Sequence, residues 1–400
     1  MSSTRRERVL LAAVIYVVLL AQVLLYPGLG RLVATLGATT DLQPRMWFLG
    51  AEFAAFILFV GIWGAVSDAT GRRVPWIVVG ALGGALGYGV LALLPRLSLA
   101  SFETVLILRV VQGAATIGAF SLAITMLMDL DGGHGRNMGA AGIAIGLGTA
   151  MGAPIGGQLT ELSPVAPLYA ATVLLAAVGL LVTLVEDRAP QGRRSTREAL
   201  ATIRRTPTLS IPYAFGMIDR MTAGFFALVG VAYFESAFDL SPGESGIMLA
   251  LFFAPFALLQ YPMGALSDRI GRTIPIVVGS SLYGLGIAAI GLVERVEFAG
   301  AGMVVIGVLG ALLAPATMAL VTDVASDIDR GTAMAGFNLF GSVGFFAGFL
   351  LGGTIAGAYG YPLAFFVVGG LEVLIAIVTL PAFLRLGLGD VPTVTAGSSD

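Results

Sequence analysis

Residues 64–75 read GAVSDATGRRVP, and residues 264–275 read GALSDRIGRTIP. Gly, Ser, Asp, Gly, Arg and Pro recur at matching places in the two stretches, at an offset of 200 residues. A second pair keeps the same offset, because residues 148–157 read GTAMGAPIGG and residues 348–357 read GFLLGGTIAG. Two markers at one offset indicate a duplication, so the chain is predicted to consist of two homologous halves related by a parallel repeat.

The composition indicates the solvent in which these halves fold. Of the 400 residues, 57% are hydrophobic and 12% are charged, and the mean hydropathy is +0.93. Soluble globular proteins carry about 25% charged residues, so most of this apolar surface must face lipid. The 55 glycines suit the close helix contacts of membrane proteins. The sequence therefore predicts an all-α membrane protein.

The residue counts exclude several kinds of site. The chain has no cysteine and no lysine, and His134 is its single histidine. Disulfides, thiolate ligands and the lysine-containing phosphate-binding loop are therefore impossible. One histidine cannot assemble a metal cluster, and no nucleophile motif stands out. We expect no enzymatic activity, no cofactor, no metal and no nucleic-acid partner.

Twelve stretches are predicted to span the membrane, six in each half, because a spanning helix needs about 20 mostly apolar residues. The first run is too long for a cleaved leader and is expected to be retained. The third and ninth stretches are short. The predicted spans are 9–33, 46–66, 76–95, 102–128, 138–160, 166–185, 210–236, 244–266, 276–293, 299–322, 332–357 and 363–385.

These spans divide the chain into four parts. We expect a first six-helix bundle at 1–185, a cytoplasmic linker at 186–209, a second six-helix bundle at 210–386 and a disordered tail at 387–400. In the linker, Ser195-Thr196-Arg197-Glu198 has the pattern of a capping box that opens a short basic helix.

Arginine placement predicts the orientation. With both termini inside, the inside segments hold sixteen arginines and the outside loops hold four, while Arg109 and Arg220 fall within spans. Cytoplasmic loops carry such an excess of positive charge. The chain is therefore expected in the plasma (inner) membrane, with both termini cytoplasmic, as a monomer.

The first repeat resembles the signature loop of the major facilitator superfamily, which has the pattern G-x-x-x-D-x-x-G-R-R. Its residues here are Gly64, Asp68, Gly71, Arg72 and Arg73. The second copy keeps Gly264, Asp268, Gly271 and Arg272, with Thr273 in the place of the second arginine.

Two further stretches carry the same resemblance. Arg109, Gln112 and Gly113 in the fourth span are similar to the family's R-x-x-Q-G motif. The stretch 148–157 resembles the fifth-span motif of the drug–proton antiporters, except that Ala153 occupies the usual proline position and Pro154 follows it. The resemblance implies the twelve-helix major facilitator fold of two pseudo-symmetric bundles, with spans one, four, seven and ten around a central cavity.

Both copies of the charged loop are interpreted as a conformational latch. Carboxylates and guanidinium groups a few residues apart can pair with one another and with helix ends, and Gly71 permits a tight turn. The alternative is a static turn. The latch residues are Gly64, Asp68, Gly71, Arg72, Arg73, Gly264, Asp268, Gly271 and Arg272.

Glycines four residues apart share one helix face and make a smooth surface for close contact. We expect these surfaces to form a seam between the two bundles that lets them rock, with Pro154 bending the fifth span. The seam residues are Gly148, Gly152, Pro154, Gly156, Gly157, Gly344, Gly348 and Gly352.

Charged residues inside spans are costly and are functional candidates by default. Asp219, about 15 Å into the seventh span, is predicted to carry the driving proton, with Arg109 or Arg220 as the competing positive group. The alternative for Asp219 is a structural ion pair. Glu52 is either a second coupling group or an interfacial residue paired with Arg31 or Arg45.

The remaining candidates have weaker patterns. Glu372 is expected to be structural, His134 solvated, and the acidic residues Asp129, Asp131, Asp323, Asp327 and Asp329 either solvated or paired with Arg136 or Arg330. The candidates for the substrate cavity are Gln22, Tyr26, Gln112, Tyr233, Gln260, Phe337 and Asn338.

The favoured function is proton-coupled efflux of small, partly hydrophobic or drug-like compounds by alternating access. Proton-linked uptake or facilitated diffusion of a sugar or organic acid remains open, since the arginine of the fourth span would suit an anion. A receptor or scaffold without transport activity is a third possibility, but no soluble signalling domain supports it.

Overall fold

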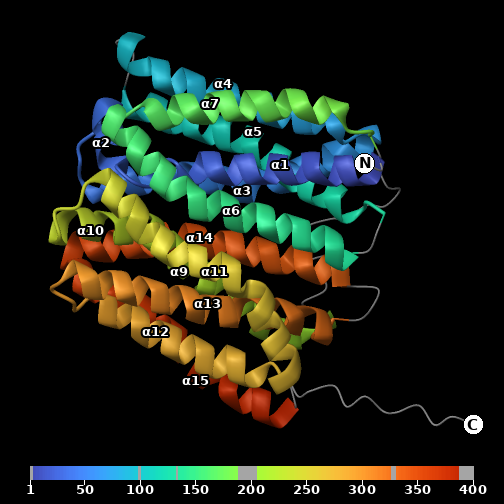
Figure 1. Ribbon diagram of the computed structural model, residues 1–400, viewed down its shortest axis with the longest axis vertical. Coiled ribbons are helices and arrows are strands. Elements are labelled where there is room, and N and C mark those ends of the chain that lie inside the picture. Colours follow the sequence, from blue (N-terminus) through green and yellow to red (C-terminus); the bar gives the residue numbers. More distant parts are fainter. Residues whose placement is uncertain (1–2, 98–100, 132–133, 188–204, 326–329, 387–400) are drawn as a thin grey trace, which may run out of the picture.

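The computed structural model describes residues 3–97, 101–131, 134–187, 205–325 and 330–386, and within these ranges every regular element is a helix (Figure 1). The first half forms α1 (Ser3–Val23), α2 (Leu29–Thr35), α3 (Leu42–Thr70), α4 (Val74–Leu93), α5 (Phe102–Met128), α6 (His134–Leu162) and α7 (Ala166–Leu181). The second half forms α9 (Ser210–Phe225), α10 (Val231–Ala237), α11 (Pro242–Ile270), α12 (Gly279–Ile290), α13 (Val296–Val324), α14 (Arg330–Tyr359) and α15 (Tyr361–Leu386).

Ten helical segments of the described ranges are long and apolar enough to cross a membrane. α1 is not among them because four of its first six residues are charged, namely Arg5, Arg6, Glu7 and Arg8. The segment Ile274–Ile290 is apolar but shorter. The third predicted span, which was marginal from the sequence, qualifies as Val74–Leu97. The predicted capping box at 195–198 and the tail at 387–400 lie outside the described residues.

The first and seventh predicted spans are not continuous α-helices. The chain leaves helical geometry after Val23, where Pro27 cannot donate a backbone hydrogen bond and Gly28 takes a φ of 70°, and it resumes as α2. The seventh span contains a π-helical turn, Phe226–Gly230, between α9 and α10. A similar turn, Ile274–Val278, leads into α12.

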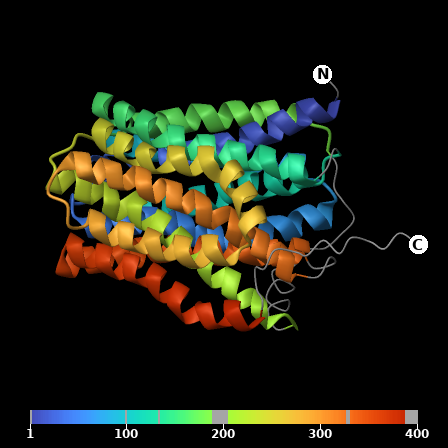
Figure 2. The same cartoon turned by 60° about the horizontal axis from the view of Figure 1, so that its bottom comes forward.

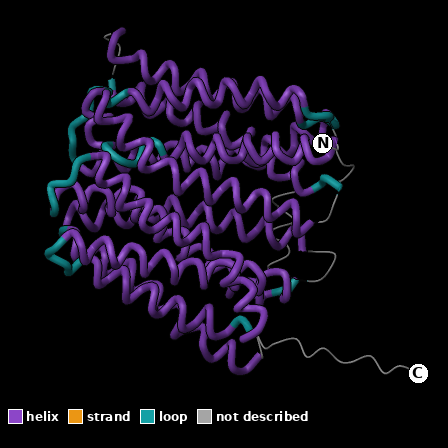
Figure 3. The backbone as a smooth tube through the Cα atoms, viewed as in Figure 1, coloured by secondary structure: helices purple, strands orange, loops and turns teal. Residues whose placement is uncertain are grey.

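The long helices run side by side and share two ends, as the views in Figures 1 and 2 agree. The N-terminus lies at one end, together with the turn at Arg73 between α3 and α4; this is called the Arg73 end. α2 and α10 lie at the opposite end, called the Glu235 end after a residue of α10. Short loops join the helices there (Figure 3).

Most helix contacts stay within one half of the chain. α1 packs on α5, α6 and α7, and α4 packs on α5 and α7. In the second half, α9 packs on α14, α11 on α13, and α12 on α13 and α15. The main contacts between the halves are those of α6 with α11 and of α3 with α14. At the second of these, the rings of Phe53 and Phe345 stack at 4.5 Å.

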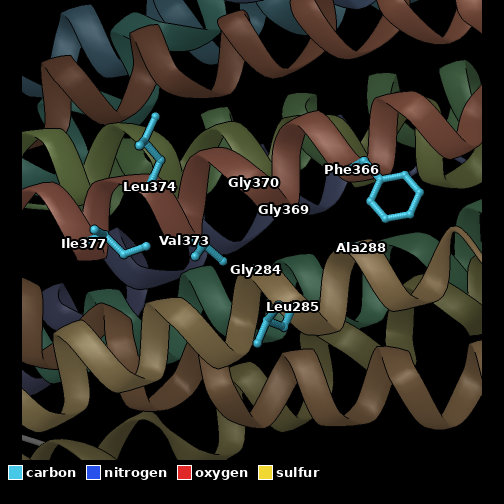
Figure 4. Close-up of a pocket in the computed structure, with 9 residues that line it drawn as sticks. All are labelled: Gly284, Leu285, Ala288, Phe366, Gly369, Gly370, Val373, Leu374 and Ile377. Atoms are coloured by element: carbon cyan, nitrogen blue, oxygen red, sulfur yellow. The ribbon is translucent and has the colours of Figure 1, made fainter.

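A shallow apolar groove of about 410 Å³ lies between α12 and α15 (Figure 4). The two helices approach closely because Gly284 faces the backbone carbonyl of Gly369. The groove is lined by Gly284, Leu285 and Ala288 of α12 and by Phe366, Gly369, Gly370, Val373, Leu374 and Ile377 of α15.

Candidate functional site

A buried ion pair joins α3 to α5. Arg109 Nη2 lies 2.5 Å from Glu52 Oε2, and the two side chains are 0% and 1% exposed. Arg109 Nη1 donates to Gln112 Oε1 at 2.6 Å, while Gln112 Nε2 and the Tyr88 hydroxyl donate to Glu52 Oε1 at 3.1 and 3.2 Å. The guanidinium also stacks on Phe48, 4.4 Å from the ring centre. Each charge is therefore compensated by a partner and by hydrogen bonds, as buried charges require.

This pair corrects two predictions. Glu52 does not pair with Arg31 or Arg45, because its side of α3 faces α5 rather than the loop residues. Arg109 binds Glu52 within the first half, so it is not the positive group beside Asp219. Gln112, a predicted cavity residue, belongs to the same buried network.

Asp219 and Arg220 of α9 point in different directions. Arg220 Nη2 donates to Asn338 Oδ1 at 3.1 Å, and its guanidinium lies 5.8 Å from the Phe337 ring centre. Consecutive helical residues are about 100° apart, so Asp219 faces elsewhere. Asp219 is half-buried, and we find no ion pair or hydrogen bond for its carboxylate within the described ranges. The structural ion pair considered for Asp219 is therefore absent in this conformation.

Glu372 is fully buried between α15, α9 and α12. Its Oε1 lies 3.1 Å from the Thr222 hydroxyl, and its Oε2 lies 2.8 Å from the Ser280 hydroxyl. The carboxylate of Asp219, three residues before Thr222 on α9, acts electrostatically on Glu372. The second half thus contains two carboxyl groups that interact.

The first charged loop is held within its own half. Gly71 takes a φ of 63°, which glycine adopts without strain. Arg73 Nη1 lies 2.5 Å from Asp129 Oδ2 at the end of α5. Asp187 Oδ1 accepts from the backbone N–H groups of Arg73 and Val74 at 2.8 and 3.2 Å. These contacts join the α3–α4 turn to the ends of α5 and α7.

The second charged loop repeats the arrangement with different residues. Arg272 Nη1 lies 2.6 Å from Asp268 Oδ1, and its Nε lies 3.1 Å from Asp323 Oδ2 near the end of α13. Burial lowers the pKa of Arg272, but its hydrogen bonds to Asp268 and Asp323 outweigh burial and raise that pKa above its usual value. Arg272 thus plays the part that Arg73 plays in the first half.

Pairing inside the first loop is not observed. Asp68 is without an ion pair among the described residues, and Arg72 is exposed. Asp129 and Asp323, predicted as solvated or paired with Arg136 or Arg330, instead hold Arg73 and Arg272. Asp327 and Asp329 lie outside the described residues, and the side chains of His134 and Arg330 are not described.

The glycine ladders lie within the halves, which corrects their prediction as a seam between them. Gly148 and Gly152 of α6 contact α1 at Leu19 and Val23, and Gly156 contacts the carbonyl of Leu24 just beyond α1. Their counterparts Gly344, Gly348 and Gly352 of α14 contact α9. For two predicted seam residues, Pro154 and Gly157, the prediction is confirmed, because they meet α11 of the other half beside Gly146 and Ala153. Sequence spacing identifies a shared face but not the helix it meets.

The polar contacts between the halves gather at the Glu235 end. Arg45 Nη1 lies 2.8 Å from Glu235 Oε2, and Gly28 N–H donates to Glu235 Oε1 at 3.1 Å. Gly243 N–H donates to Glu161 Oε1 at 3.0 Å. The sequence analysis missed Glu235 and Glu161, because a charged residue at the end of a span is ordinary.

Among the described residues, three glycines toward the Arg73 end of α3 and α6 have open space beside them. A methyl group added at Gly64 of α3, or at Gly139 or Gly142 of α6, would meet nothing within 4 Å. The same two helices make the closest contacts with α14 and α11 farther along. Within the described ranges, the closest contacts between the halves thus run from the middle of the helices to the Glu235 end.

The predicted cavity residues do not form one site. Phe337 and Asn338 gather around Arg220, while Tyr233 donates to the carbonyls of Ile290 and Val293 in an aromatic cluster. Tyr26 and Gln22 are buried in the first half, and the Gln22 amide nitrogen has no hydrogen-bond partner among the described residues. Gln260 is half-buried on α11.

Comparison with curated proteins finds drug-resistance relatives. Tetracycline resistance protein, class G, of Vibrio anguillarum is 27% identical over 241 residues, which are 58% of this chain and 60% of that protein. Multidrug resistance protein MdtG of Enterobacter lignolyticus is 24% identical over 399 residues, covering 94% of this chain and 92% of that protein.

A solved structure shares the fold. A bacterial homologue of the human lysosomal transporter Spinster, in an inward-facing and occupied conformation, gives a TM-score of 0.80 at 15% identity, over 96% of this chain and 98% of that one. The sequence model of the Major Facilitator Superfamily matches residues 10–234 and 213–393, nearly the whole chain. The chain therefore belongs to the Major Facilitator Superfamily and is a multi-pass membrane transporter, not an enzyme.

Proposed function

We propose that the chain exports small, partly hydrophobic compounds in exchange for protons. The observation that carries this proposal is Asp219, a half-buried carboxylate in the middle of a span with no ion pair among the described residues. A carboxylate with a fixed cationic partner keeps its charge, whereas one without such a partner can take up and release a proton. The drug-resistance names of the two relatives support efflux as the direction.

The transporter works as two six-helix bundles of twelve spans, with α1 and the segment Ile274–Ile290 completing the ten spans identified by length and composition. The arginine excess supports an orientation in the plasma (inner) membrane with both termini, and so the Arg73 end, on the cytoplasmic side. The Glu235 end then faces outward. The transporter acts as a monomer.

Alternating access follows from where the halves touch. The contacts of Glu235 with Arg45 and Gly28 hold the outer end together, while the described residues make fewer close contacts between the halves at the Arg73 end. This arrangement corresponds to a state that receives cargo from the cytoplasm. Rocking about the α6–α11 and α3–α14 contacts would break the outer contacts and bring the Arg73 ends together.

Asp219 is the group that couples this motion to protons. Its carboxylate would be protonated from the acidic outer side and deprotonated toward the cytoplasm, since a change in its surroundings changes the relative stability of its two forms. Phe337, Asn338 and Arg220 lie on neighbouring faces of α14 and α9 and are proposed to contact cargo.

The second candidate is proton-linked uptake or facilitated diffusion of a polar nutrient. The Arg220–Asn338 pair favours it, because a guanidinium and an amide suit a sugar or an organic acid better than a hydrophobic drug.

Asp219→Asn in proteoliposomes tests the proposal. Asparagine keeps the shape and removes the titrating group, so the variant should exchange cargo down its gradient and lose accumulation driven by a pH gradient. A panel of drugs, sugars and organic acids identifies the cargo class in the same assay. Full pH-driven accumulation by Asp219→Asn would place the proton site elsewhere.

A further inference from the structure

Among the described residues, Glu372 and Glu52 have carboxyl groups that are fully buried inside the spans, and these two groups differ in their partners. Glu52 has the Arg109 guanidinium 2.5 Å away as a counter-charge. Glu372 is equally buried, at 0% exposed, but its described polar partners are the hydroxyls of Thr222 and Ser280. A buried carboxylate without a cation is strongly unfavourable, and such groups take up a proton instead.

Counting hydrogens at Ser280 supports a neutral Glu372. The Ser280 Oγ lies 2.8 Å from Glu372 Oε2 and 3.0 Å from the backbone oxygen of the same residue. A hydroxyl has one hydrogen, so it can donate fully to only one of these oxygens. A proton on Oε2 satisfies both contacts, because Glu372 then donates to Ser280 and Ser280 donates to the backbone oxygen.

Thr222 connects this carboxyl group to the proposed coupling site. Its hydroxyl is fully buried and lies 3.1 Å from Glu372 Oε1. Asp219 is three residues earlier on α9, so Asp219 and Thr222 lie on neighbouring positions of one helix face.

The charged and titratable groups around Glu372 are few. From α9 they are Asp219, whose charge acts on Glu372, and Arg220, which is turned toward Asn338. From α12 the titratable group is Tyr283, which is fully buried and interacts electrostatically with the carboxyl groups of Asp219 and Glu372. A second negative charge beside Asp219 would repel it, so a proton shared between the two carboxyl groups relieves that repulsion.

We propose that Glu372 is a second proton-binding site, which carries its proton in this conformation and exchanges it with Asp219 past the Thr222 hydroxyl. The inference rests on the proposed proton coupling of Asp219 for the exchange step. The presence of the proton on Glu372 rests on the contacts of Glu372 alone.

Infrared spectroscopy of the purified protein tests the proton directly, because a protonated carboxyl group has a carbonyl stretch that shifts in D₂O. The wild type should show this band at neutral pH, and Glu372→Gln should lose it. Ser280→Ala should shift the band without removing it, and this variant also serves if Glu372→Gln fails to fold. Glu297→Gln, which changes an exposed acidic side chain, is the control and should keep the band. A band that survives in Glu372→Gln, or that Ser280→Ala leaves unshifted, overturns the assignment.

Transport in proteoliposomes tests the exchange. Glu372→Gln should retain cargo exchange down a cargo gradient and accumulate less cargo than the wild type under a pH gradient. Unchanged accumulation overturns the proposed proton exchange between Glu372 and Asp219.

The proposal for Glu372 and the coupling proposal for Asp219 can fail independently. If Asp219→Asn removes the band and Glu372→Gln does not, the proton belongs to Asp219, and the coupling proposal stands without Glu372. If Asp219→Asn keeps full pH-driven transport, the coupling proposal fails, while the band still decides whether Glu372 holds a proton.

Discussion

Arg45 at the start of α3 forms an ion pair with Glu235 of α10, with 2.8 Å between Arg45 Nη1 and Glu235 Oε2. This ion pair joins the two halves of the chain at the Glu235 end. Both side chains are mostly buried, at 15% and 18% exposed. The second carboxylate oxygen of Glu235 accepts from the backbone of Gly28. Glu235 therefore holds α3 and the loop after α1 at once.

Glu235→Gln is expected to favour opening of the Glu235 end. Losing a charged hydrogen-bonding partner costs about 1–3 kcal/mol, which changes a two-state equilibrium by about 5- to 150-fold. A single cysteine at Thr160, which is buried beside Pro27, should react faster with an outside reagent in this variant. Glu297→Gln is the control, because Glu297 pairs with Arg295 in an exposed position. Equal labelling rates in all three proteins would contradict a closing role for Glu235.

Glu52→Gln is expected to destabilise the first half. It leaves the Arg109 guanidinium buried without a counter-charge, which costs about 3–5 kcal/mol. Thermal unfolding in detergent should show a clear drop for Glu52→Gln and for Arg109→Ala. The double variant Glu52→Gln/Arg109→Gln should lose less than the sum of the single losses, because no charge is left unpaired. Additive losses would show that the pair contributes no coupling energy.

Asp68→Asn is expected to reduce transport strongly while leaving the thermal stability unchanged. Asp68 has no ion pair among the described residues, so its removal breaks nothing in this conformation. Its predicted latch contact would form only in the other conformation. Asp129→Asn is the informative comparison, since it breaks the Arg73 pair seen here and should lower stability. Wild-type transport by a well-expressed Asp68→Asn protein would reject the latch.

Gly156→Ala is expected to destabilise the protein, because an added methyl group would collide with the backbone carbonyl of Leu24. Gly142→Ala on the same helix is the matched control, since nothing lies within 4 Å of a methyl group there. Core overpacking costs about 1–3 kcal/mol, whereas the control should be neutral or slightly stabilising. Thermal unfolding of the two variants measures the difference. Equal stability would mean that α6 can move away from α1 without cost.

The proposed orientation predicts which ends can be labelled from outside. The chain has no cysteine, so single cysteines can be introduced without background. A cysteine at the exposed Arg96, in the turn after α4 at the Glu235 end, should react with an impermeant reagent in intact cells. A cysteine in 186–209 should react only after the membrane is permeabilised. The reverse result would invert the topology.

The helix positions were predictable because apolar runs end sharply at charges and turns. The predicted span 102–128 coincides with α5, Phe102–Met128. The partners of the site residues were not predictable in the same way. The hydropathy pattern gives the depth of Glu52 within its membrane span. Its pairing with Arg109 depends on which face of α3 meets α5, and the pattern does not give that face. The glycine spacing likewise fixed a face of α6 without indicating that α1 covers it.

Residues without a sequence motif carry much of the candidate site. Thr222 and Ser280 match no pattern, and their importance arises only because α9 and α12 bring both hydroxyls to the Glu372 carboxyl group. Glu235 stands at the end of a span, where a charge is ordinary. Its contact with Arg45 depends on two residues 190 positions apart in the chain.

The π-helical turn Phe226–Gly230 lies between Asp219 and Glu235 in one continuous span. A π-helical turn holds one residue more than the α-helical turn it replaces. If it tightened into an α-helix, everything after it would rotate by about 100° and shift by about 1.5 Å relative to the part before it. This rotation could break the ion pair of Glu235 with Arg45 while Asp219 keeps its position. The π-helical turn thus divides the span into a segment that stays in place and a segment that can rotate about the helix axis.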